Sequence, residues 1–79
     1  KRGKQKRAVM IVMEKPIFPS EIQKRAKTIN PKLSLNNTSD IVRSFTEQGL
    51  AHCLNPKEKI GRLYELTRKG KRVRKEIVG

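Results

Sequence analysis

The apolar residues of this chain recur in two rhythms, one typical of helices and one typical of strands. From residue 4 to 14 they cover a wide stripe, which predicts a helix buried on more than one side, although its valines and isoleucines would also suit a buried strand. Pro16 ends this element, because the residue before a proline avoids the helical region. Residues 19–28 predict a second helix, with Ile22 and Ala26 four residues apart on its inward face.

Residues 34–48 predict a third helix that ends before Gly49, a residue suited to a left-handed stop. Its cap could be Ser34, Asn36 or Asn37, which are all good capping types. The buried stripe has helical spacing and consists of Thr38, Ile41, Val42 and Phe45. The opposite face is polar and consists of Asn36, Asp40, Arg43 and Glu47, flanked by Asn37, Ser39 and Ser44.

The last third of the chain predicts a β-hairpin and a fourth helix. LAHCL and RLYELT read as short strands on either side of the turn segment NPKEKIG. Thr67 can cap a helix that runs to residue 78 with Val73 and Ile77 inward. Gly70 weakens that helix by about 1 kcal/mol relative to alanine, so we expect it to allow a close backbone approach. Ile17 and Phe18 could add a strand stub or fill the core.

We therefore expect one domain over residues 1–79, with residues 1–5 as a flexible basic arm. The predicted fold class is mainly α with a small antiparallel β-hairpin, an α+β fold in the order helix, helix, helix, hairpin, helix. Short connections hold the three helices together, and the hairpin buries one face against them while its tip projects.

The charge is unevenly distributed along the chain. The formal net charge is +13, with five basic residues in 1–7 and six in 68–75, whereas only Asp40, Arg43 and Glu47 are charged between Leu33 and Pro56. Such an excess predicts a polyanionic partner, with nucleic acid first and an anionic membrane surface second. The apolar run 8–13 is too short for a signal core or a membrane span.

Catalytic and metal chemistry find little support in the sequence. The single Cys53 excludes an intramolecular disulfide, and Cys53 with the adjacent His52 does not make a zinc site. No serine has an evident base, and there is no Gly-rich phosphate loop. We expect a protein that is not an enzyme and that uses no cofactor and no metal.

Three stretches carry a resemblance to a known family. They are PSEIQKRA, the junction formed by Glu47, Gly49 and Leu50, and the junction formed by Leu66, Thr67 and Gly70. Their order resembles the winged helix-turn-helix DNA-binding domains, and in particular the MarR-like and related small bacterial and archaeal regulators. The resemblance implies a cytoplasmic, nucleoid-associated regulator of transcription that binds double-stranded DNA. The arginine pair often found at the wing tip is missing, and no long terminal helices for dimerisation are visible, so homodimer formation stays open.

The resemblance and the residue chemistry together suggest specific contacts. Base readout in the major groove is expected from the third helix, through Asn36, Asn37, Ser39, Asp40 and Arg43. Backbone contacts are expected from Lys24, Lys27, Lys32, Ser44, Lys57, Lys59 and Arg62.

Several of these residues have a simpler interpretation. The asparagines could serve as helix caps without contacting DNA, and Asp40 could pair with Arg43. The basic face of the last helix could be exposed to solvent without binding a partner. The alternative functions are a winged-helix module for RNA or ribonucleoprotein, and a protein–protein adaptor with an exposed apolar patch. That patch would comprise Met10, Met13, Ile77 and Val78, and it could equally form a homodimer interface.

Overall fold

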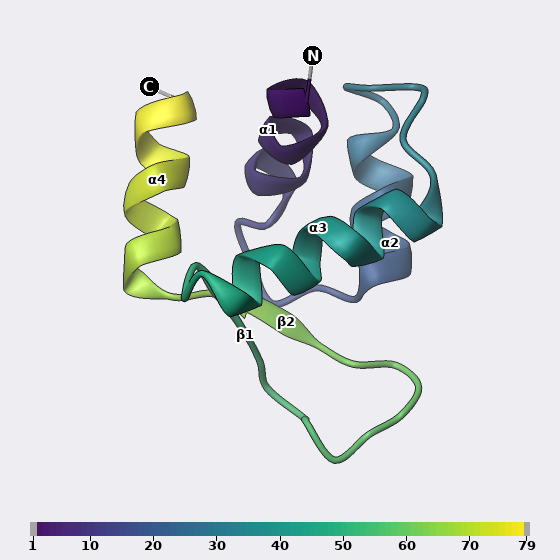
Figure 1. The fold of residues 1–79 in the computed structure, drawn as a ribbon, viewed down its shortest axis with the longest axis vertical. Helices are drawn as coiled ribbons and strands as arrows, with labels where there is room; N and C mark the ends of the chain where they lie inside the picture. Colours follow the sequence, from purple (N-terminus) through teal and green to yellow (C-terminus); the bar gives the residue numbers. More distant parts are fainter. Residues whose placement is uncertain (1, 79) are drawn as a thin grey trace.

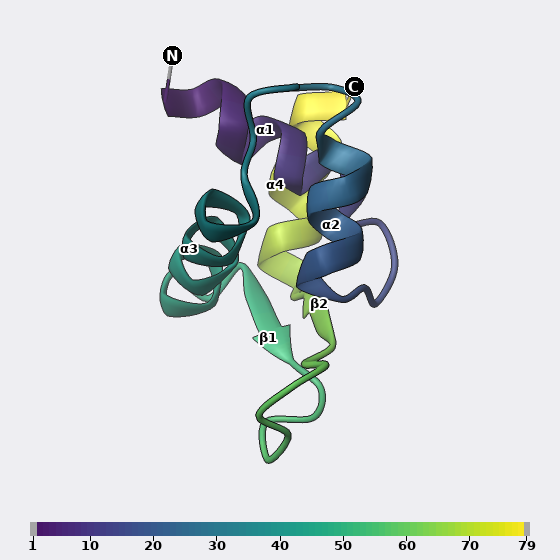
Figure 2. The same ribbon diagram turned by 90° about the vertical axis from the view of Figure 1, so that its right-hand side faces the viewer.

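The computed structural model describes residues 2–78 of the chain and the side chains of residues 4–78. The elements, in chain order, are helices α1 (Arg2–Val12), α2 (Pro19–Ala26) and α3 (Leu35–Glu47), strands β1 (Ala51–Cys53) and β2 (Tyr64–Leu66), and helix α4 (Arg68–Val78). This mainly helical α+β architecture confirms the predicted class and element order. In Figures 1 and 2, α3 lies across the other helices, and the hairpin loop projects from the end opposite to both termini.

Helix α1 is the centre of the core. It packs against α2, α3 and α4, and Ala8, Val9 and Met10 are almost completely buried. The wide apolar stripe is therefore helical, and the alternative of a buried strand is wrong. Met13, just after the helix, is also buried, so Met10 and Met13 cannot contribute to the exposed apolar patch that an adaptor would need.

The start of α1 overlaps the segment expected to form a basic arm. The helix begins at Arg2, so residues 2–5, which were expected to form a flexible basic arm, belong to its first turns. Lysine, arginine and glutamine are good helix formers, and they continue the helix from the buried segment toward the N-terminus. Residue 1 lies outside the described residues.

The hairpin is attached to the helices through Ile17. The backbone N–H of Ile17 donates to the carbonyl of Tyr64 at 2.8 Å, and the N–H of Tyr64 donates back at 3.0 Å. Of the two alternatives expected for Ile17 and Phe18, Ile17 fulfils both, since it forms an isolated β-bridge and is buried in the core, whereas Phe18 is 45% exposed. In the sheet, Ala51 faces Leu66 and Cys53 faces Tyr64.

Thr67 fixes the junction between the hairpin and α4. Its Oγ1 donates to the carbonyl of Gly49 at 2.6 Å and accepts from the N–H of Gly70 at 3.2 Å, which confirms it as the cap of α4. Gly49 has the left-handed backbone predicted for it, with φ +77°. A Cβ atom at Gly70 would overlap the carbonyl oxygen of Leu50, so the close backbone approach is also confirmed. Val73 and Ile77 pack against the core as predicted.

Candidate nucleic-acid interface

The polar face of α3 is set by the cap at the start of this helix. The hydroxyl of Ser34 accepts a hydrogen bond from the N–H of Asn37 at 3.1 Å, so Ser34 supplies the side-chain cap. The side chains of Asn36 and Asn37 are exposed. Thr38, Ile41, Val42 and Phe45 form the buried stripe, as the spacing predicted. The capping role proposed as an alternative for the asparagines is therefore not needed.

The outward face of α3 is exposed and lacks internal ion pairs. Asn36, Asp40, Arg43 and Glu47 are all exposed, and Ser39 is half-buried beside them. The salt bridges found among residues 4–78 join Arg25 to Glu21, His52 to Glu65 and Arg74 to Glu14. Within this part of the chain Asp40 therefore does not pair with Arg43, and both side chains are available to an external partner.

An open groove separates α3 from the hairpin loop, with the start of α2 as its third side. Its volume is about 800 Å³. Four residues predicted as nucleic-acid contacts line it, two from α3 and two from the loop: Ser39, Arg43, Lys59 and Arg62. They come from two segments that are distant in the sequence, and the fold brings them to one concave surface.

The hairpin loop is held in place by its own polar contacts. The carboxamide of Asn55 spans the loop, because its Oδ1 accepts from the N–H of Leu63 at 2.7 Å and its Nδ2 donates to the carbonyl of Gly61 at 3.1 Å. Arg62 donates from Nε to the carbonyl of Glu58 at 2.8 Å. The cationic side chains of the loop thus project from a defined backbone, which lowers the entropy lost when they bind a partner.

The other predicted contact residues lie outside this groove. Lys24 and Lys27 are exposed on α2, and Lys57 is exposed on the loop. Asn37 is exposed on the flank of α3 away from the groove, and Ser44 on the same flank accepts a hydrogen bond from Gln48 at 2.8 Å.

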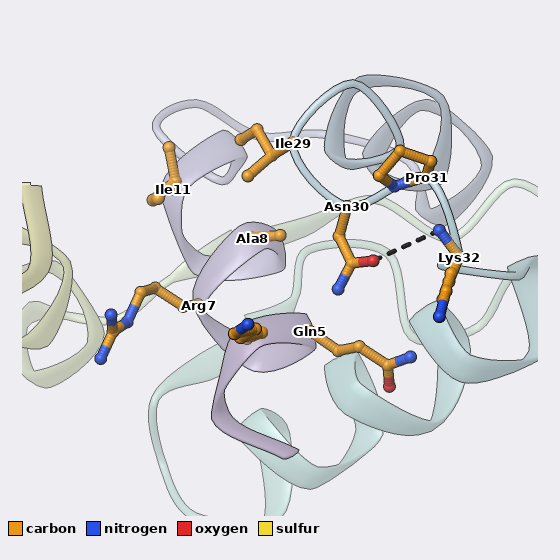
Figure 3. A pocket seen from close by; sticks show the side chains of 9 residues that line it. Gln5, Arg7, Ala8, Ile11, Ile29, Asn30, Pro31 and Lys32 are labelled. Carbon is orange, nitrogen blue, oxygen red and sulfur yellow. Dashed lines mark hydrogen bonds between the residues drawn. The ribbon is translucent and has the colours of Figure 1, made fainter. Parts of the chain in front are cut away.

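Lys32 lies in a second pocket, between α1 and the turn that connects α2 to α3. Figure 3 shows Gln5 and Ala8 of α1 on one side of this pocket and Asn30 and Lys32 on the other, while Arg7 extends away from the turn. The backbone N–H of Lys32 donates to Asn30 Oδ1 at 3.2 Å. The structure therefore does not bring Lys32 together with the residues of the groove.

Two basic residues of α4 have structural roles. Arg74 donates from Nε to the carbonyl of Ile11 at 2.9 Å and lies 3.4 Å from a carboxylate oxygen of Glu14. Lys69 Nζ lies 3.4 Å from the carbonyl of Gln48. The basic face of α4 is thus partly explained by contacts that join this helix to α1 and to the end of α3.

The histidine and the cysteine have local partners. His52 Nε2 lies 3.1 Å from Glu65 Oε1 across the hairpin, and Cys53 Sγ lies 3.5 Å from Asn55 Oδ1. Within residues 2–78 there is no group of three or more metal-ligating side chains that could hold an ion. In the same part of the chain, no helix combines the length and the apolar character needed to cross a membrane.

Three apolar residues of the groove were not predicted from the sequence as part of a binding surface. Phe18, Leu35 and Ile60 line it together and are 45%, 48% and 90% exposed. Ile60 gave a signal that could have been noticed, because it is the one aliphatic side chain in the polar turn segment 55–61. Comparison of the chain with protein-family models, with curated proteins and with solved structures finds no match. The interpretation of the groove therefore depends on the geometry and chemistry of the residues that line it.

Proposed function

We propose that this protein is a winged helix-turn-helix module that binds double-stranded DNA and regulates transcription without catalysing a reaction. In this proposal α2 and α3 form the helix-turn-helix, and residues 51–66 form the wing. One observation supports it above the others: the exposed, internally unpaired polar face of α3 borders a groove whose opposite wall carries Lys59 and Arg62.

Helix α3 has the chemistry of a reading helix. A helix fits the width of the major groove, where each base pair presents its own pattern of donors and acceptors. The carboxamide of Asn36 can bond bidentately to adenine, and the guanidinium of Arg43 can bond in the same way to guanine N7 and O6. Asp40 can accept from cytosine N4. Because Asp40 and Glu47 would repel phosphates, this face is better suited to base edges than to the backbone.

The groove between α3 and the wing suits a sugar–phosphate strand. Lys59 and Arg62 on its wing side supply cationic donors, and the hydroxyl of Ser39 adds a neutral one, while Arg43 and Glu47 line the α3 side, which faces the bases in this proposal. A DNA strand bound in this position would place α3 in the duplex groove on one side of that strand. The wing would lie beside the duplex groove on the other side. Lys24, Lys27 and Lys57 are exposed outside the groove and add to the overall attraction of the phosphates.

A salt titration of duplex binding tests the proposal. Each phosphate contact contributes a slope of about −0.9 to the plot of log affinity against log salt concentration. We expect a steep slope, together with NMR shift perturbations that include Asn36 through Arg43. Affinity indifferent to salt, or perturbations that skip this segment, would contradict the proposal. Competition with a structured RNA provides the control, because an RNA-binding module would prefer the RNA competitor.

A further inference from the structure

Ile60 is an apolar side chain in a place where the fold does not use it. It is 90% exposed, more than any other large hydrophobic side chain among the described residues. Single exposed apolar residues are common at protein surfaces. Ile60, however, lies in the same groove as Phe18 and Leu35, and apolar surface rimmed by polar residues is typical of an interaction site.

The loop holds Ile60 in this exposed position. Gly61, the next residue, has φ +71°, and its carbonyl accepts from Asn55 Nδ2. The same side chain of Asn55 also accepts, through Oδ1, from the N–H of Leu63 at 2.7 Å. The exposure of Ile60 is therefore part of an ordered turn, and presenting the side chain to a partner needs little further ordering of the backbone.

The charges around Ile60 indicate the chemistry of that partner. Residues 55–62 of the hairpin loop include Lys57, Lys59 and Arg62 against the single acid Glu58. These cations attract a polyanion, whereas Ile60 needs an apolar surface that lies between the anionic groups. The minor groove of duplex DNA offers both, because its phosphate strands flank a floor of stacked bases and sugar rings, and architectural proteins insert apolar side chains there.

We infer that Ile60 inserts into the minor groove as an apolar wedge against a base step, with Lys59 and Arg62 on the flanking phosphates. This inference rests on the proposed DNA-binding function and adds a preference to it. Pyrimidine–purine steps such as TA open and kink most easily. A duplex that offers such steps under the wing should bind more tightly than a stiff A-tract, through a residue that makes no hydrogen bond to a base.

The test compares the protein with its Ile60→Ala variant on two duplexes of equal length, one of alternating A·T pairs and one a continuous A-tract. We expect the protein to prefer the alternating duplex by about tenfold, and Ile60→Ala to lose most of this preference, since TA steps deform more easily. The salt slope should stay unchanged in Ile60→Ala, whereas Lys59→Ala should reduce its magnitude by about 0.9. Ile29→Ala, which alters an exposed isoleucine outside the groove, is the matched control.

A second readout detects the wedge directly. With 2-aminopurine in place of one adenine of the alternating duplex, unstacking at a base step raises the fluorescence, and Ile60→Ala should suppress that rise. Equal preference and equal fluorescence for the protein and Ile60→Ala would overturn the inference but leave DNA binding intact. Failure of the unmodified protein to bind either duplex would overturn both proposals. A change of sedimentation in Ile60→Ala with unchanged DNA affinity would assign the residue to a homodimer interface and also overturn the wedge.

Discussion

The guanidinium of Arg74 donates from Nε to the backbone carbonyl of Ile11 at 2.9 Å, joining two helices across 63 positions of sequence. That carbonyl belongs to the last turn of α1, where backbone acceptors have no partner within the helix. Arg74 is also within 3.4 Å of the carboxylate of Glu14. One side chain thus caps the C-terminal end of α1 and holds α4 against it.

Replacement of Arg74 should therefore destabilise the fold. Arg74→Met keeps most of the aliphatic length and removes the charged donor, and we expect a loss of about 1–2 kcal/mol in the free energy of unfolding, since hydrogen bonds to charged groups are among the stronger ones. Urea denaturation measures this loss. Arg72→Met, at an exposed position of the same helix, is the control. Equal stability of the two variants would show that the contact to Ile11 contributes nothing.

Gly70 should be intolerant of even the smallest side chain. Alanine would gain up to about 1 kcal/mol of helix propensity, but its Cβ would overlap the carbonyl of Leu50 and lie about 3.1 Å from Leu66 Cδ2. Because the first of these atoms belongs to the backbone and cannot turn aside, we expect Gly70→Ala to cost about 1–3 kcal/mol net. Thermal unfolding measures it, with Lys71→Ala at an exposed position as the control. A Gly70→Ala variant as stable as the parent would mean that α4 moves away from the hairpin freely.

Features that are determined by residue type and by spacing along the chain could be predicted from the sequence. The stripe of α3, its stop at Gly49, the cap at Thr67 and the close approach at Gly70 all follow from residue type and spacing. The start of α1 was missed because KRGKQKR has no apolar rhythm, although its residues favour a helix. Three residues at the start of α3 are of good capping types, and the sequence could not decide which of them forms the capping hydrogen bond.

The groove could not be predicted from the sequence. Its apolar members Phe18, Leu35 and Ile60 belong to three separate segments, and no local pattern connects them. Tertiary packing decides which exposed side chains share one surface and which, such as Lys32, lie elsewhere. Lysine positions are also poor guides in a chain with 20 basic residues, because most of them are exposed regardless of function.

We expect helix capping and DNA recognition to depend on different residues of α3. Ser34→Ala removes the hydroxyl that accepts from the N–H of Asn37, and we expect it to cost about 1 kcal/mol of stability. Asn36→Ala removes an exposed carboxamide and should change stability by no more than about 0.5 kcal/mol, while it weakens binding to DNA. Denaturation and duplex titration on both variants measure the two effects. A large loss of stability in Asn36→Ala would show that this residue has a structural role.

Replacement of Arg43 distinguishes most sharply between base-specific hydrogen bonding and non-specific attraction to the phosphates. It projects from the outward face of α3 into the groove, without an ion pair to Asp40 or Glu47. If it bonds bidentately to a guanine, Arg43→Ala should cost about 1–3 kcal/mol at a preferred site and relax the preference at one base pair. Lys24→Ala, on the exposed face of α2, removes the same charge and should weaken all sequences alike. Selection of bound duplexes from a random pool, repeated for both variants, measures the preference at each position. Equal losses on every sequence would make Arg43 a backbone contact, and the reading role would then fall to Asn36 and its neighbours.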